Sequence, residues 1–357
     1  MQELVKKLFP NLKTDLIKSE TIIEYVESLT EWGITDSLIN NPFFDEDWGL
    51  EAFEEYLHSC DIQYAETIIE GLIKELHMEA RDSYLSNPKK YERDYAKFLE
   101  YVGEYFLDKE EPSKAKRYFF EAFSVRQHLR YMERDAELNF ATLLSKLAVA
   151  YVEVEEFKEA EYIIEEIHET VEKWRDYLDT SYYTFACMRI GMHYFDEKNY
   201  EKAAYFLERA VQLEPDENLY GLLGYAYRHI DSSKACDYLL KCVFLQYLRD
   251  QHASEIYEIL EELIDRYNSA EAYVFYFGLL FAEGMIDTDT AKEKIRNVKS
   301  NEVKLMLKAL DGNLTTNDLK NTGISLEDRA FKKLAMRVNE RAVAEVYTPM
   351  DKVLIGI

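Results

Sequence analysis

One pattern of small and aromatic residues recurs along the chain, and it restricts the possible folds more than any other feature. Its clearest copy lies within residues 184–217, in the run MRIGMHYFDEKNYEKAAYFLERAVQLEP, which contains Gly191 and Ala203. Small residues at these two positions let a pair of antiparallel helices approach closely. Tyr194 and Leu207 are expected to fill the space beside them. The pattern therefore predicts a helix pair packed around Gly191 and Ala203.

The same copy also predicts where the two helices end. Lys198 and Asn199 form the expected turn, and Pro215 ends the second helix because proline cannot continue a helix. Weaker copies of the pattern, together with a further apolar helix pair at the end, cover residues 49–78, 96–129, 141–174, 217–248 and 252–285. Each helix pair needs a neighbour to bury its apolar face, so successive copies predict an all-α, right-handed helical solenoid.

The composition supports a helical fold. The chain of 357 residues has only 6 Pro and 12 Gly, about 2% and 3% against usual levels of about 5% and 7%. A β-rich fold would need many more turn residues. Hydrophobic residues make up 47% of the chain, enough for a large core, and 28 Tyr suit wide interfaces between helices.

The charge excludes several classes of partner. There are 43 Lys and Arg against 69 Asp and Glu, a net charge of −26. Cationic side chains dominate affinity for nucleic acids, so this charge argues against a nucleic-acid partner. It also opposes docking on anionic membranes, and no apolar run approaches the ~18 residues of a membrane span. With no apolar signal segment at the start, we predict a cytoplasmic protein whose partners present basic surfaces.

The sequence contains no recognisable catalytic constellation. Nucleotide-binding glycine motifs, the HExxH and GxSxG motifs and acidic calcium loops are absent, and the seven histidines never fall at metal-ligand spacing. Cys60, Cys187, Cys236 and Cys242 form no CxxC pair and are expected to be buried reduced thiols. We therefore predict no cofactor, no metal site and no enzymatic activity.

The two ends of the chain differ from the repeats. We predict an N-terminal helical region at 1–48, a solenoid at 49–285 and a C-terminal segment at 286–357. A cationic helix near 326–345 and the apolar tail 353–357 indicate a homodimer interface, with an intramolecular cap on the solenoid as the alternative.

The pattern over 49–285 resembles the tetratricopeptide repeat (TPR), whose unit has about 34 residues. In that family the first helix of each pair lines a concave groove, and certain positions of that helix point into it. The resemblance implies that a short peptide binds there. The implied peptide-binding residues are Thr142, Ser145, Val149, Phe185, Met188, Met192, Asp196, Asn218, Tyr225, Arg228 and His229.

This list combines an apolar floor with polar ends. Met side chains adapt to irregular ligands, Asn218 can bond a peptide amide through both its carbonyl and its NH₂, and Arg228 can bind a carboxylate in two parallel bonds. The alternative is that these residues pack against the second helix, the next repeat or a capping helix.

The stretch SYYTFACMRIGMHYFDEKNYEKAAYFLERAVQL also resembles the repeats of bacterial Rap-type and related peptide-sensing regulators, the RRNPP group. That resemblance implies a regulator whose groove binds a secreted oligopeptide and which controls a partner protein. Residues 1–45 show neither a clear helix-turn-helix nor a clear copy of the Rap phosphatase helices. The alternatives are a TPR scaffold without a small ligand, a diverged transcriptional regulator and a Rap-like phosphatase.

Overall fold

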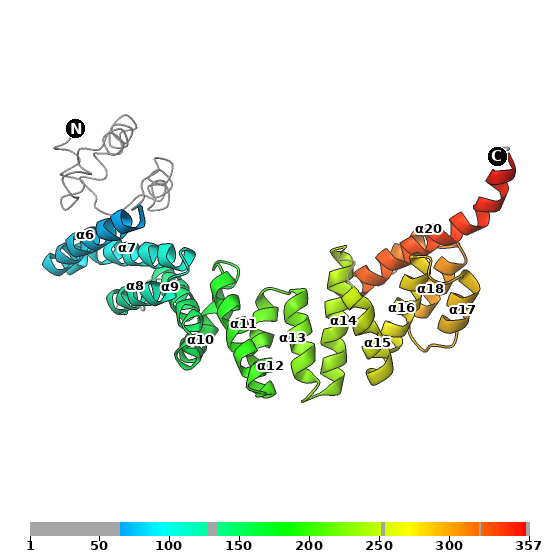
Figure 1. Cartoon of the computed structure of the whole chain (residues 1–357), viewed down its shortest axis with the longest axis horizontal. Coiled ribbons are helices and arrows are strands. Elements are labelled where there is room, and N and C mark those ends of the chain that lie inside the picture. The colour runs from blue at the N-terminus through cyan, green and yellow to red at the C-terminus, as the bar shows by residue number, and fades with distance from the viewer. Residues whose placement is uncertain (1–64, 128–133, 251–253, 321–322, 355–357) are drawn as a thin grey trace. The chain divides into compact units, whose positions relative to one another are not determined.

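The computed structural model describes residues 65–127, 134–250, 254–320 and 323–354, and the regular structure in these residues is entirely α-helical (Figure 1). The chain divides into two compact units, the first ending at Ala186 and the second beginning at Cys187. This boundary falls inside helix α11 (Ser181–Asp196). The predictions made for the N-terminal region 1–48, for Cys60 and for residues 355–357 of the predicted tail 353–357 lie outside the described residues.

In unit 1, the five described helices before α11 pack consecutively, each on the next one along the chain. Proline begins two of these helices: Pro88 follows the N-cap Asn87, and Pro112 begins the next helix along the chain. The long spacing of the first repeats is explained by helices of 20 to 22 residues in α6, α7 and α9. The helices of unit 1 before α11 are α6 (Ala65–Ser86), α7 (Pro88–Asp108), α8 (Pro112–Arg126), α9 (Arg134–Glu153) and α10 (Phe157–Trp174).

A single type of turn joins the two helices of three of the pairs. Glu110, Glu155 and Lys198 each adopt a left-handed backbone, with φ of 57°, 62° and 61°. In each case the next residue donates its backbone N–H to the carbonyl five residues earlier, as Asn199 does to Tyr194 at 2.8 Å. This bond satisfies a carbonyl at the end of the first helix and reverses the chain. The predicted turn at Lys198 and Asn199 is confirmed.

Unit 2 continues the consecutive packing and ends in a long helix. Its core runs without interruption from Leu239 to Ala342, so the segment after residue 286 shares a core with the last predicted repeat. The helices after α11 are α12 (Tyr200–Leu213), α13 (Glu217–Tyr227), α14 (Ser232–Leu248), α15 (Ser254–Tyr267), α16 (Ala270–Ala282), α17 (Thr288–Ile295), α18 (Glu302–Leu310), α19 (Thr316–Lys320) and α20 (Leu326–Leu354).

Close contacts within helix pairs give the fold its TPR-like character. Gly103 lies against Phe119, Gly191 against Leu207 and Gly224 against Leu239. The second helices of these and neighbouring pairs carry fully buried alanines, which are Ala115, Ala160, Ala203 and Ala235. The predicted fold class, all-α with TPR-like helix pairs, is confirmed.

The last helix caps unit 2. One side of α20, which includes Phe331, Leu334 and Val338, is buried where the helix packs on α14, α16 and α18. The Lys333 ammonium donates to the backbone oxygens of Tyr247 and Leu248, both at 3.2 Å, at the C-terminal end of α14. The described part of α20 therefore acts as an intramolecular cap on the preceding helices. Homodimerisation stays a prediction, which light scattering can check.

No described helix is both long and apolar enough to cross a bilayer. Cys187 and Cys242 are buried, as expected, while Cys236 is only half-buried. Burial raises the pKa of the Cys242 thiol to about 12, so this thiol stays protonated at neutral pH.

Candidate functional site

Two of the four predicted peptide-binding residues of unit 1 are buried. Ser145 and Val149 on α9 are only 3% and 7% exposed, and Ser145 donates its hydroxyl hydrogen to the backbone oxygen of Ala141. Thr142 is half-buried and bonds the Leu138 oxygen in the same way. The structure corrects the assignment of Ser145 and Val149 to a ligand-contacting face, because this part of α9 is buried on most of its circumference. Phe185 is exposed.

In unit 2 the predicted residues of α11 do reach the surface. Met192 is 37% exposed, Asp196 is exposed and Met188 is half-buried. Met188 and Met192 are four residues apart and therefore neighbours on one side of the helix. Gly191 and Tyr194, in contrast, pack against α12. Helix α11 thus buries one side in its pair and leaves a methionine stripe on another.

Asn218 and His229 lie at opposite ends of α13. Asn218 is exposed in the first turn, and its backbone N–H donates to Asp216 Oδ1 at 2.8 Å. His229 follows the last turn, and its ring stacks on Tyr200 with 3.9 Å between ring centroids. The Asn218 side chain is therefore accessible to solvent, while the His229 ring already has a partner.

Tyr225 and Arg228 are brought into direct contact. The Arg228 guanidinium lies over the Tyr225 ring, 4.2 Å from its centroid, and forms an ion pair with Glu262 of α15. Burial raises the pKa of Tyr225, so its hydroxyl stays neutral at physiological pH. Arg266 and Tyr267 complete a group that we name the Arg228 cluster: Tyr225, Arg228, Glu262, Arg266 and Tyr267.

Glu262 was not among the predicted site residues, although its separation from Arg228 was a usable signal. Glu262 follows Arg228 by 34 residues, about the length of one TPR unit. Residues one repeat apart occupy equivalent places on neighbouring helix pairs. A search for opposite charges at that separation would have proposed this ion pair.

An ion pair similar to that of Arg228 and Glu262 links two helices of unit 1. Lys146 of α9 forms an ion pair with Glu104 of α7, and its ammonium lies 5.5 Å from the ring centroid of Tyr182. Lys146 has a side-chain exposure of only 13%. A partly buried cation thus links first helices of neighbouring pairs in unit 1, as Arg228 does in unit 2.

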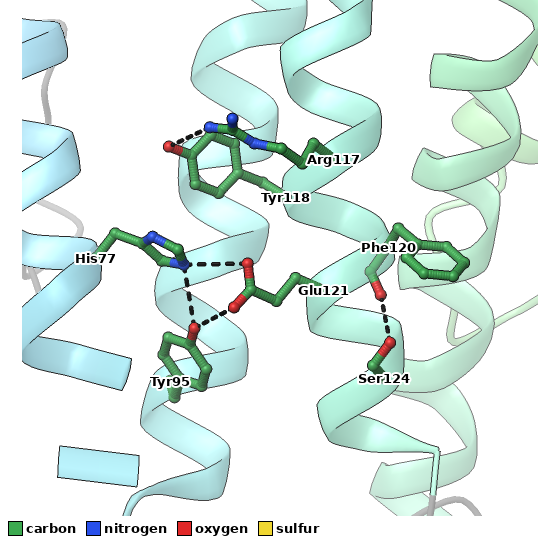
Figure 2. A network of polar contacts seen from close by, with 7 residues as sticks. All are labelled: His77, Tyr95, Arg117, Tyr118, Phe120, Glu121 and Ser124. Carbon is green, nitrogen blue, oxygen red and sulfur yellow. Dashed lines mark hydrogen bonds and ion pairs between the residues drawn. The ribbon is translucent and has the colours of Figure 1, made fainter. Parts of the chain in front are cut away.

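A second polar group in unit 1 connects α6, α7 and α8, as Figure 2 shows. His77 Nε2 lies 3.1 Å from Glu121 Oε2, and the Tyr95 hydroxyl donates to Glu121 Oε1 at 2.5 Å. The Tyr95 oxygen is also 3.1 Å from His77 Nε2. The only hydrogen of the hydroxyl is used on Glu121, so Nε2 must carry a proton and donate to Tyr95. We name these three residues the His77 network.

The His77 network is suited to holding helices together. The hydrogen bond with His77, assisted by the one from Tyr95, holds the pKa of Glu121 below its ordinary value of 4.5, although burial acts in the opposite direction. Burial, followed by the bond to Glu121, raises the pKa of Tyr95 well above its ordinary value. Glu121 is therefore ionised and Tyr95 neutral at pH 7. Neither an unprotonated Nε2 base nor an activated nucleophile is present in this group.

Among the described residues, no three His, Cys, Asp or Glu side chains come together in a way that could hold a metal ion.

Comparison with known proteins finds distant structural likenesses. No protein-family model matches the chain, and no curated protein matches its sequence. Similar solved structures include the TPR2AB domain of yeast Sti1 in a complex with pHSP90, at 16% identity and a TM-score of 0.29, covering 70% of this chain and 94% of that one. They also include the Rap conjugation gene regulator of plasmid pLS20 with the Phr* peptide, at 16% identity and a TM-score of 0.36, covering 97% and 96%. These likenesses concern the helical-repeat fold and say nothing about a shared ligand or activity.

Proposed function

We propose that this chain is a peptide-responsive regulator that controls a partner protein. A short oligopeptide binds the face of unit 2 that is formed by α11 and α13, the first helices of their pairs. The observation that carries this proposal is the methionine stripe of α11. Solvated helix faces normally carry charged side chains, and a protein with a net charge of −26 has many available. Met188 and Met192 instead occupy positions where side chains reach the surface.

Polar groups of the same unit supply the remaining requirements of peptide recognition. Asn218, exposed in the first turn of α13, offers an amide that can pair with a peptide backbone. Arg228 offers a guanidinium that is already positioned by the Tyr225 ring. The proposed peptide has about five to ten residues, with apolar side chains for the methionines and a carboxylate for Arg228. The role requires no reaction catalysed by this chain.

The proposal is tested with the full-length chain and a pool of hexapeptides, analysed by affinity selection and then by calorimetric titration of the retained peptides. We expect Met192→Glu to abolish retention, because a carboxylate would replace the apolar contact. Met336→Glu is the matched control, since Met336 is exposed to a similar extent, 43% against 37%, but lies on α20. Equal retention by the two variants and the wild type would contradict the proposal.

A TPR scaffold without a small ligand is the second candidate. It is favoured by large aromatic side chains that unit 1 exposes: Phe120 on α8 at 51%, Tyr162 on α10 at 71% and Tyr177 just beyond α10 at 69%. Exposed aromatic residues are enriched at protein–protein contacts. A partner protein whose binding is lost in Tyr162→Glu but unchanged in Met192→Glu would favour this candidate. The phosphatase and transcriptional alternatives concern residues outside those described.

A further inference from the structure

We propose that Glu262 occupies the site on Arg228 to which a ligand carboxylate binds. A peptide with a free C-terminal carboxylate displaces Glu262 from Arg228 and so breaks the ion pair between α13 and α15. This inference rests on the proposed function and specifies its chemistry. It identifies Glu262 as an internal competitor, and a carboxyl group as the part of the ligand that is sensed.

The first step is that Arg228 is fixed in position before any ligand arrives. Its guanidinium lies between the Tyr225 ring and the Glu262 carboxylate, with a side-chain exposure of 23%. A planar guanidinium stacked on an aromatic ring loses little further freedom when it binds a carboxylate. Arg228 is thus prepared for an anionic group, and the anion now bound comes from the next repeat.

The second step is that hydrogen-bonding capacity in the Arg228 cluster is incompletely used. Arg228 Nε and Glu262 Oε1 are both buried and make no hydrogen bond within the described structure. A buried polar group that lacks a partner is costly. A carboxylate that binds Arg228 through both oxygens uses Nε as well as a terminal nitrogen, which the present ion pair with Glu262 does not achieve.

The third step is that Glu262 has a second cation available when it leaves Arg228. Arg266 lies one turn later on α15, and its NH1 is 3.6 Å from Glu262 Oε1. One carboxylate therefore faces two guanidinium groups. Glu262 can turn toward Arg266 without becoming an unpaired charge, so exchange with a ligand carboxylate conserves the number of ion pairs.

The consequence is a link between ligand binding and the arrangement of the repeats. The Arg228–Glu262 pair ties α13 to α15 across one repeat. Curvature in repeat proteins is the sum of small rotations between neighbours. A ligand that removes this tie favours states in which α13 and α15 are no longer held together.

The test compares two preparations of one hexapeptide pool, with free C-terminal carboxylates and with C-terminal amides, on the full-length chain. Glu262→Gln removes the competing charge, so we expect it to strengthen binding of the acids by on the order of tenfold, a difference of about 1.4 kcal/mol, and to leave the amides unchanged. Glu258→Gln, an exposed position one turn earlier on α15, is the control and should change neither.

A second variant keeps the test decisive if Glu262→Gln folds poorly, which circular dichroism would reveal. Arg266→Gln removes the alternative partner of Glu262 from an exposed site, so Glu262 should stay on Arg228 and the acids should bind more weakly. Acids and amides that bind equally to every variant would overturn the inference while leaving the proposed function in place. Retention of neither pool by any variant would overturn both.

Discussion

Gly191 of α11 lies directly against Leu207 of α12. A Cβ placed on Gly191 would be 2.6 Å from Leu207 Cγ and 3.3 Å from the backbone oxygen of Ala203. Both neighbours are fully buried, so they cannot easily move away. The absence of a side chain at residue 191 is therefore what sets the distance between the two helices.

This relationship predicts the effect of adding one methyl group. We expect Gly191→Ala to lower the free energy of unfolding by about 1–3 kcal/mol, the usual cost of overpacking a core. Denaturant titration followed by circular dichroism measures the change.

Gly221→Ala is the matched control for this prediction. Gly221 lies within α13, where the nearest atom to an added Cβ is Cys242 Sγ at 3.6 Å, an ordinary contact distance. Alanine is the better helix former by about 1 kcal/mol, so this variant should be as stable as the wild type or more so. A loss of stability in Gly221→Ala equal to that of Gly191→Ala would show that the close contact is not responsible.

The turn between α11 and α12 predicts a substitution that stabilises the protein. Lys198 is exposed and has φ of 61°, a conformation that costs a non-glycine residue roughly 1–2 kcal/mol. We expect Lys198→Gly to raise the melting temperature, with part of the gain offset by the greater flexibility of glycine when unfolded. The control Glu258→Gly, at an exposed position inside α15, should lower it.

A further prediction concerns the contact between α20 and α14. Lys333 Nζ bonds two carbonyl oxygens at the end of α14 and also Asp250 Oδ1 at 2.6 Å. A cation at the C-terminal end of a helix contributes about 0.3–1 kcal/mol. We expect Lys333→Met to reduce stability by about that amount, measured by urea unfolding. Lys332→Met, at the half-buried neighbouring position, is the comparison, and an equal loss there would count against the capping contact.

The helix pairs could be predicted from the sequence because the constraint on them is local. Gly191 and Leu207 are separated by the same number of residues as Gly103 and Phe119, so the spacing of the close contact recurs between copies of the pattern. A spacing that repeats is visible in a single sequence. The turn at Lys198 was predictable for the same reason.

The surroundings of the predicted site were much less predictable. Whether Ser145 and Val149 are accessible depends on how much of α9 its neighbours cover, and position within the repeat carries no information on that coverage. The role of Arg228 in binding a peptide carboxylate stays a prediction, and its ion pair with Glu262 depends on contact between different repeats. The His77 network joins residues 18 and 26 positions apart on three helices, and neither separation is a repeat length.

The last prediction concerns the pH dependence of unit 1, which follows from the His77 network. The pKa of Glu121 is lowered below 4.5 in the folded protein, first by the hydrogen bond with His77. A carboxyl group of this kind contributes stability that is present above its unfolded pKa and is lost as the pH falls through the folded pKa. We therefore expect the contribution of Glu121 to be present at pH 7 and to disappear as the pH falls below about 4.

Urea unfolding of the wild type and of Glu121→Gln over this pH range measures that contribution. The difference between the two proteins should be greatest at neutral pH and should shrink in acid, because glutamine resembles the protonated carboxyl group. Tyr95→Phe removes one of the two bonds that favour the ionised form and should reduce the difference without abolishing it. Glu169→Gln, at an exposed position on α10, is the control. If the Glu121→Gln difference stayed the same from pH 7 to pH 3, the charge of Glu121 would have no part in stabilising these helices.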